Sequence, residues 1–259
     1  TGLPCIAASA TQSLGYASIL MVDLFGVDWL RHGRMDSRFL TVINAEDTLT
    51  PTAVVQSKES KDGATRFTVE VNIDNQRGEK VLLGQASGYV GKVDPSWGAD
   101  DYEKRLAELK ADPTMKHDPT ASPALEPLEY VVTPPLNQQF CYGEEDYKPW
   151  YIEETEIGPP ITHPGLLLNW SNRTRSPSAR IIPAQWGLHA RDEDFFYNPV
   201  RVGQKVRVTW PGMIGTYEKR GRPWEAYQCL VVDEDGKVVL RRISHGTYAS
   251  QQYKKDYKR

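Results

Sequence analysis

The sequence contains little cysteine. Among its 259 residues, only Cys5, Cys141 and Cys229 are cysteines. Three widely spaced cysteines do not fit a disulfide framework, and their spacing is not that of a zinc site. We therefore expect a reducing compartment, the cytoplasm, and no bound metal.

The sequence also lacks long apolar runs and an excess of either charge. The longest apolar candidate, residues 17–30, is interrupted by Asp23 and Asp28, whereas a membrane-spanning helix needs about 20 mostly apolar residues. The 31 basic and 34 acidic residues are interspersed, and they give a net charge of -3. No glycine-rich phosphate loop, zinc spacing or Ser-His-Asp order occurs. We therefore expect no membrane span and no nucleic-acid partner, and we find no support for a nucleotide triphosphatase, a metalloenzyme or a serine hydrolase.

The apolar residues that are present follow two kinds of spacing. Apolar residues make up 39% of the chain and aromatic residues 10%, enough for the core of one large domain or two ordinary modules. Residues 9–30 carry apolar side chains at helical spacing, which predicts a buried central helix. Stretches with strand character follow at residues 35–43, 49–56, 65–73 and 80–90. A helix followed by an antiparallel meander is expected.

The composition changes between residues 91 and 124. A charged helical segment comes first, and a stretch rich in proline, serine and alanine follows it, which predicts a linker helix and an extended strap. Charged residues fill most of the faces of this helix, so we expect it to lie on the surface without forming a further core. The earlier pattern then returns, with an apolar run at 163–169 and strand-like stretches at 192–197, 205–214, 224–232 and 238–245.

The two halves align at an offset of about 157 residues. At this offset His32 matches His189, Asp36 matches Glu193 and Phe39 matches Phe196. Several matches in the same order predict a duplicated module. The predicted organisation is a first module at residues 1–95, part of which is expected to precede Thr1, a linker at 96–125, a second module at 126–250 and a tail at 251–259.

Several segments resemble one known family. PITHPGLLLN at residues 160–169, GLHARDEDFFYNPVRVGQKV at 187–206 and DEDGKVVLRR at 233–242 are similar to one half of the MaoC-like double-hotdog acyl-CoA hydratases and dehydratases. GQASGYV at 84–90 is similar to the other half. The resemblance implies an α+β tandem (double) hotdog fold, in which an antiparallel sheet wraps around long central helices.

The resemblance also implies a chemistry. The family carries a hydratase loop of the form D-x-N-P-x-H, and the matching string here is DYKPWY, with Asp146 at the acid position and Tyr151 in place of the histidine. His163 stands at the histidine of the P-I-x-H segment. The implied catalytic residues are therefore Asp146, Tyr151 and His163, which would hold a water over the double bond of a 2-enoyl thioester. A phenol with a pKa near 10 is a poor base at neutral pH.

Further residues are implied in substrate binding. Trp150, Leu166 and Leu167 would line the acyl tunnel, and a backbone N–H near Gly165 would polarise the thioester carbonyl. The substrate is expected to be an acyl-CoA, with no cofactor beyond that CoA. Since exposed edges of hotdog sheets usually require pairing, a homo- or hetero-oligomer is also expected.

Two arginines and one histidine are the remaining candidates for substrate binding. Arg220 and Arg222 would meet a CoA phosphate, although KRGR is first of all a hairpin signal. His189 would lie at the entry of a strand of the second module. It also has a structural explanation, because it can pair with Asp192 or Glu193.

Structural explanations exist for the catalytic candidates too. His163 can cap the start of a helix, Asp146 can be a solvated acid in the run GEED, and Trp150 and Tyr151 can be packing aromatics.

Two other functions remain open at this stage. A non-catalytic hotdog subunit that binds an acyl chain, or completes the active site of a partner, is favoured by Tyr151 and by Ala7 at the place that corresponds to His163. A hotdog thioesterase would need a carboxylate on the central helix, where Asp23 and Asp28 stand.

Overall fold

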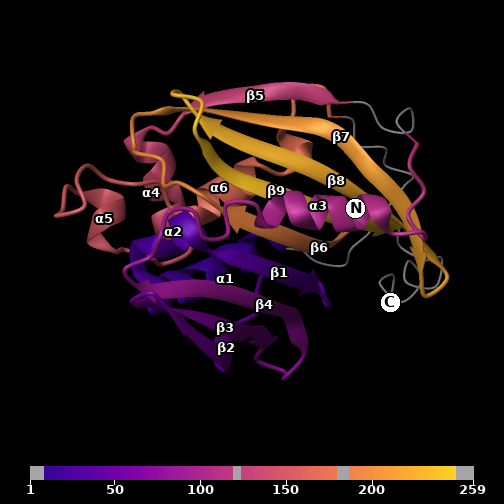
Figure 1. Ribbon diagram of the computed structural model, residues 1–259, viewed down its shortest axis with the longest axis horizontal. Helices are drawn as coiled ribbons and strands as arrows, with labels where there is room; N and C mark the ends of the chain where they lie inside the picture. The colour runs from indigo at the N-terminus through magenta and orange to yellow at the C-terminus, as the bar shows by residue number, and fades with distance from the viewer. Residues whose placement is uncertain (1–8, 119–123, 180–186, 249–259) are drawn as a thin grey trace.

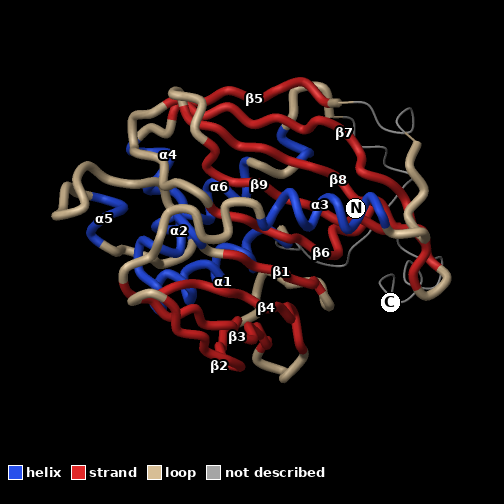
Figure 2. The backbone as a smooth tube through the Cα atoms, viewed as in Figure 1, coloured by secondary structure: helices blue, strands red, loops and turns tan. Residues whose placement is uncertain are grey.

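The sheet of this protein is a single antiparallel layer built from both halves of the chain. A computed structural model describes residues 9–118, 124–179 and 187–248. It has nine strands in the order β2-β3-β4-β1-β6-β9-β8-β7-β5 (Figures 1 and 2). The predicted tandem hotdog fold, with the sheets of two modules merged into one, is confirmed. Cys5, Ala7 and the predicted tail lie outside the described residues.

The two halves join where β1 (Arg34–Phe39) pairs with β6 (Gly187–Phe196). In this register Asp36 lies directly opposite Glu193. The 157-residue offset matches the same two residues. Equivalent residues of the two modules therefore lie opposite each other at this pair, as a pseudo-twofold axis requires. The duplication predicted from the sequence therefore coincides with the joint of the sheet.

The remaining strands form one meander in each half. The first half contains β2 (Leu49–Lys61), β3 (Ala64–Asn75) and β4 (Lys80–Gly91), and the second contains β7 (Lys205–Lys219), β8 (Arg222–Asp233) and β9 (Val238–Tyr248). The matched turn glycines Gly78 and Gly236 both have positive φ, 73° and 78°, a conformation that glycine adopts without steric cost. The sequence pattern predicts all these strands but not β5 (Leu125–Val131), which pairs with β7 at the edge of the sheet.

The predicted helix at residues 9–30 occurs as three consecutive pieces. Ser9 caps α1 (Ala10–Phe25) by accepting a hydrogen bond from the N–H of Thr11, and Gly26, at φ 62°, ends it. A 3-10 turn, η1 (Gly26–Asp28), and α2 (Trp29–His32) follow. By length and composition alone the stretch Ala10–His32 could cross a membrane, but 56% of its most apolar window is buried inside the protein.

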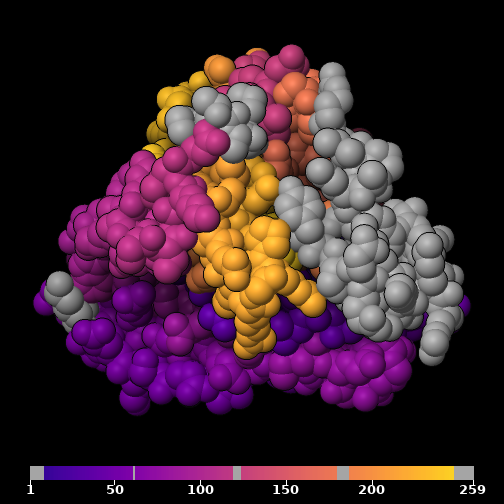
Figure 3. All heavy atoms as spheres, turned by 90° about the vertical axis from the view of Figure 1, so that its right-hand side faces the viewer, coloured from indigo at the N-terminus to yellow at the C-terminus, as the bar shows by residue number. Residues whose placement is uncertain are grey.

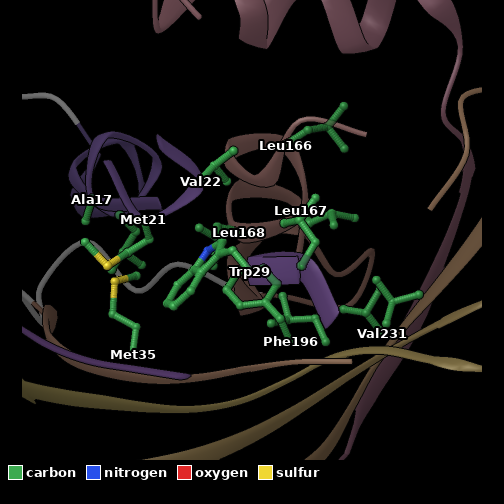
Figure 4. Packing of buried hydrophobic residues seen from close by; sticks show 14 of the residues in the cluster. Ala17, Met21, Val22, Trp29, Met35, Leu166, Leu167, Leu168, Phe196 and Val231 are labelled. Atoms are coloured by element: carbon green, nitrogen blue, oxygen red, sulfur yellow. The ribbon is translucent and has the colours of Figure 1, made fainter. Parts of the chain in front are cut away.

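The second half has a shorter central helix, α6 (Pro164–Trp170), preceded by α4 (Pro134–Gly143) and α5 (Pro149–Ile152). Helix α1 packs against α6 and against β2, β3 and β4. Figure 4 shows Trp29 inside the resulting core, near Leu168 and Phe196. The rings of Trp29 and Phe196 lie 5.5 Å apart between centroids. One continuous core therefore serves both modules.

A fully buried arginine fixes the end of α6 to the sheet. Arg242 on β9 lies 2.6 Å from Asp192 Oδ2 and 2.6 Å from Asp194 Oδ1, both on β6. Its Nη1 also donates to the carbonyl of Leu168 and to the hydroxyl of Ser171, at 2.6 and 2.7 Å. A buried charge of this kind is tolerated because it is paired and hydrogen-bonded.

The linker helix differs from the expectation. Helix α3 (Asp101–Ala111) buries Tyr102, Leu106 and Leu109, and with residues of the sheet they form a second hydrophobic cluster that includes Phe195 and Ile243. Phe196, the next residue after Phe195, belongs to the main core, so α3 covers the opposite face of the sheet. The expectation that this helix forms no further core is wrong, because three apolar residues one helical turn apart suffice for a narrow buried stripe.

Candidate active site

His163 stands at the start of α6 as its N-cap residue. Its Nδ1 accepts a hydrogen bond from the N–H of Gly165 at 3.1 Å. The capping explanation offered by the sequence is thus confirmed. Because Nδ1 is the acceptor, the neutral ring carries its proton on Nε2. Since Gly165 donates its N–H to this ring, that group is not free to polarise a carbonyl, and the role expected for it needs correction.

Asp146 faces the other side of the same imidazole. Its Oδ2 lies 3.3 Å from His163 Nε2, and neither atom has a hydrogen-bond partner of good geometry among the described residues. The side chains of Asp146 and His163 are only 3% and 0% exposed. The explanation of Asp146 as a solvated loop acid is therefore wrong.

A lysine holds the second oxygen of Asp146. Lys148 Nζ lies 2.7 Å from Asp146 Oδ1 and 2.9 Å from Asp23 Oδ1, so it connects the loop to α1. Burial by itself raises the pKa of Asp146, but His163 and Lys148 outweigh it, and the pKa lies below its usual value. Burial lowers the pKa of His163, against the opposing effect of Asp146. At neutral pH the pair is therefore a carboxylate beside a neutral imidazole.

Glu144 is a third ionisable group at this place, and the sequence analysis did not select it. A Cβ built on Gly15 of α1 would lie 2.1 Å from Glu144 Oε2, and a Cβ built on Gly165 would lie 2.3 Å from Oε1. The carboxyl group therefore fits between the two helices only because both positions are glycine. Burial, and next the charge of Asp146, raise the pKa of Glu144 to about 8. The only sign of this site in the sequence was Gly15 inside the apolar stripe of a predicted helix. A glycine there lowers helix stability by about 1 kcal/mol relative to alanine.

Asn137 on α4 ties these segments together. Its amide donates to the carbonyl of Tyr151 at 2.8 Å and accepts from the N–H of His163 at 2.8 Å. Asn137 is fully buried, so this contact holds α5 and the start of α6 at a fixed separation.

Comparisons with known proteins concern the fold. No family model and no curated protein sequence matches the chain. Among solved structures, a protein from Chloroflexus aurantiacus described as a MaoC domain dehydratase superposes with a TM-score of 0.66 at 13% identity, covering 93% of this chain and 82% of that one. A conserved hypothetical protein from Mycobacterium tuberculosis, described as having a double hotdog fold, gives 0.64 at 12% identity, covering 96% and 84%. This chain has the double hotdog fold.

A third solved structure that this chain resembles has a description that names a different activity. A protein from Lactobacillus plantarum described as an oleoyl thioesterase superposes with a TM-score of 0.53 at 11% identity, covering 94% of this chain and 90% of that one. At such identities the likeness shows only the architecture, and an architecture hosts many functions. The chemistry must therefore be argued from the residues of the site.

Tyr151 lies within the site of this double hotdog protein, beside the imidazole of His163. Its ring meets that of His163 edge-on at 4.9 Å, and its side chain is 1% exposed. Burial, and next the charge of Asp146, raise the pKa of the phenol well above 10. The phenol therefore stays protonated at neutral pH, as expected for a phenol that is a poor base, and it does not supply a base to the site.

Replacing Tyr151 by phenylalanine tests whether the hydroxyl group takes part in catalysis. The Tyr151→Phe variant is expected to keep any thioester-processing activity within about threefold of the wild type, because it removes only a hydroxyl group that cannot take up a proton at neutral pH. Steady-state rates of both proteins between pH 6 and 9 provide the measurement. A loss of a hundredfold or more would restore Tyr151 as a catalytic residue.

The residues expected to line an acyl tunnel divide into two groups. Trp150 is half-buried, and its ring meets Tyr151 edge-on at 6.1 Å, so it belongs to the periphery of the site. Leu166 and Leu167 are 0% and 1% exposed and belong to the closed core (Figure 4). The two leucines are core residues in this structure and line no open tunnel.

The other candidates for substrate binding lie apart from the site. His189 Nε2 is 2.9 Å from Asp192, which confirms its structural explanation, and its ring packs on Phe39. Arg220 and Arg222 flank the turn between β7 and β8, where Arg220 has a φ of 53°. This hairpin and α5 lie at opposite ends of the molecule (Figure 1), and Figure 3 shows the hairpin on the surface in orange. The structure does not bring these three residues to Asp146.

The described part of the chain offers no ready metal centre. Within residues 9–118, 124–179 and 187–248, no group of three or more histidine, cysteine, aspartate or glutamate side chains is arranged to hold a metal ion. The ionisable side chains near α6 include the carboxyls of Glu144 and Asp146, the imidazole of His163 and the ammonium of Lys148.

Proposed function

We propose that this protein adds water to, or removes it from, a 2-enoyl/3-hydroxyacyl thioester, with an acyl-CoA as the substrate. The observation that carries the proposal is the buried Asp146 carboxylate, whose Oδ2 faces His163 Nε2 at 3.3 Å within a double hotdog fold. The neighbour from Chloroflexus aurantiacus described as a dehydratase supports this class of reaction.

The pair has the chemistry that hydration needs. An ionised Asp146 can accept a proton from water as the water oxygen bonds to C3, while the π electrons of the double bond move toward C2 and the thioester carbonyl. Buried polar atoms normally have a hydrogen-bond partner. A reacting water between Asp146 Oδ2 and His163 Nε2 would satisfy both atoms, which are otherwise unpaired within the described residues.

An assay of the purified protein tests the proposal. The substrates are enoyl-CoA thioesters of short, medium and long chain, and each is compared with the same acyl group on acyl-carrier protein. As the 3-hydroxyacyl product forms, the absorbance of the conjugated double bond should decrease. Mass spectrometry should find one water added. If no enoyl thioester is hydrated and no 3-hydroxyacyl thioester is dehydrated, the proposal is overturned.

One observation favours a second candidate, a subunit that binds acyl chains without catalysis. Lys148 and Tyr151 stand where the resembling family has asparagine and histidine, and the side chains of Asp146 and His163 are almost completely enclosed. Calorimetric binding of a non-reactive acyl-CoA without turnover by the isolated protein would favour this candidate.

The carboxylates of the central helix do not support the thioesterase alternative. The Asp23 side chain is 53% exposed and pairs with Lys148, and that of Asp28 is 38% exposed and pairs with Arg31. Neither carboxylate is enclosed, and Asp23 is connected to Asp146 only through Lys148.

A further inference from the structure

We propose that Glu144 is a second catalytic residue of this site, which exchanges a proton with C2 of the acyl thioester. The inference rests on the proposed function and deepens it. It assigns to Glu144 the acid-base role that the resemblance gave to the position of Tyr151.

The first support is the notch that holds the Glu144 side chain. Gly15 on α1 and Gly165 on α6 both leave out the atom that would collide with the carboxylate oxygens. A glycine within α1 lowers helix stability, yet it stands at the position where the carboxyl group needs room. The two helices that belong to different modules therefore form one receptacle for this side chain.

The second support is an unused oxygen beside the imidazole. Glu144 Oε2 is buried and has no hydrogen-bond partner among the described residues, and its side chain is 5% exposed. It lies 4.0 Å from His163 Nδ1, while Asp146 lies on the Nε2 side of the same ring. Two carboxyl groups therefore flank one imidazole, and each has one buried oxygen without a hydrogen-bond partner among the described residues.

The third support is the opposite protonation of the two carboxyls. The ionisable groups beside Glu144 are Asp146, Cys141 of α4 and His163 at α6. Lys148 and Asp23 lie on the side of Asp146, and Tyr151 lies beside His163. Lys148 is committed to the two aspartates, and burial raises the pKa of Glu144 to about 8. Two carboxyls whose pKa values are pushed apart can serve as an acid and a base at the same pH.

The proton balance of the step is closed. In hydration, water loses a proton to the Asp146 carboxylate and its oxygen bonds to C3, while the π electrons form an enolate at C2. The Glu144 carboxyl then donates its proton to C2, a C–H bond forms, and the enolate collapses to the thioester. Asp146 ends protonated and Glu144 ionised, and exchange with solvent after product release restores both. Dehydration runs the same steps in reverse.

The Glu144→Gln variant provides the test, because it keeps the size of the side chain and removes the transferable proton. It is expected to hydrate enoyl-CoA about 10²–10⁴-fold more slowly than the wild type, mainly through kcat. Glu145→Gln is the matched control, since Glu145 is the exposed neighbour in the same loop, and its rate should be unchanged.

The pH profile separates a catalytic role from a structural one. Hydration by the wild type should fall as pH rises through about 8, because Glu144 then loses the proton that it donates, and this alkaline limb should be missing from the residual rate of Glu144→Gln. A decrease of less than tenfold, or an unchanged alkaline limb in the variant, overturns the inference while the hydratase proposal stands. A wild type that hydrates no enoyl thioester overturns both.

A further readout uses the wild type alone and does not require the variant to fold. The wild type should exchange the C2 protons of a saturated acyl-CoA with D₂O faster as pH rises through 8, because Glu144 then becomes a base. An exchange rate that is independent of pH in this range overturns the inference.

Melting temperatures of the wild type and of Glu144→Gln test whether the pKa of Glu144 is raised. Its raised pKa makes the wild type lose stability from about pH 4.5 to 8, so the stability of Glu144→Gln relative to the wild type should increase over that interval.

Discussion

The Asp146→Asn variant is expected to hydrate 2-enoyl thioesters about 10²–10⁴-fold more slowly than the wild type. An amide cannot take up the proton of water, although it keeps the shape of the carboxyl group. The expected cost in stability is small, about 1 kcal/mol, because the amide oxygen can still accept the hydrogen bond from Lys148, which also keeps its contact with Asp23. Rates and thermal unfolding of the same preparations provide the measurement.

A matched exchange at an exposed aspartate controls for the mutation itself. Asp235→Asn, in the turn between β8 and β9, changes a side chain that is 63% exposed, and both activity and stability should stay at wild-type values. If Asp146→Asn retains full activity, Asp146 is not the base. If it unfolds, the role of Asp146 is structural.

The Arg242→Leu variant is expected to lose about 3–5 kcal/mol in its free energy of unfolding. The substitution leaves the carboxylates of Asp192 and Asp194 buried without their cation, and it removes the donors to Leu168 and Ser171 at the end of α6. Chemical denaturation at pH 7 measures the loss.

The neighbouring arginine provides the control. Arg241 pairs with Glu103, whose side chain is 59% exposed, so Arg241→Leu should cost at most about 1 kcal/mol. Adding Asp192→Asn and Asp194→Asn to Arg242→Leu should recover part of the lost stability, because the uncompensated charges are then gone. A loss below 1 kcal/mol for Arg242→Leu alone would mean that the buried ion cluster contributes little to the fold.

Most of the secondary structure could be predicted from the sequence, because periodicity reports which side of an element is buried. The alternating strands of both meanders and the long apolar helix carry this pattern clearly. The repeat offset predicted the duplication, and the structure adds that the matched residues Asp36 and Glu193 pair across β1 and β6. Strand β5 was missed because it lies at an edge and follows a stretch rich in proline.

The individual roles of site residues were harder to predict. Tyr151 was selected by its position in a motif, but its pKa depends on how completely the surrounding segments enclose it. Arg220 and Arg222 carry the right charge for a phosphate, yet the hairpin that bears them points to another end of the molecule (Figure 1). The charge of a residue and its position in a motif can be read from the sequence. Its burial and its distance from other residues depend on segments that are distant along the chain.

The sequence by itself determined the duplicated architecture, because apolar periodicity and repeat offsets are properties of the order of residues along the chain. Its resemblance to a known family added Asp146 and His163 as candidates. Only the tertiary structure decided that Glu144 lies between Gly15 and Gly165, and that Arg242 is neutralised by Asp192 and Asp194. These contacts join residues up to about 130 positions apart, and whether a charge is solvated or enclosed depends on which distant segments pack around it.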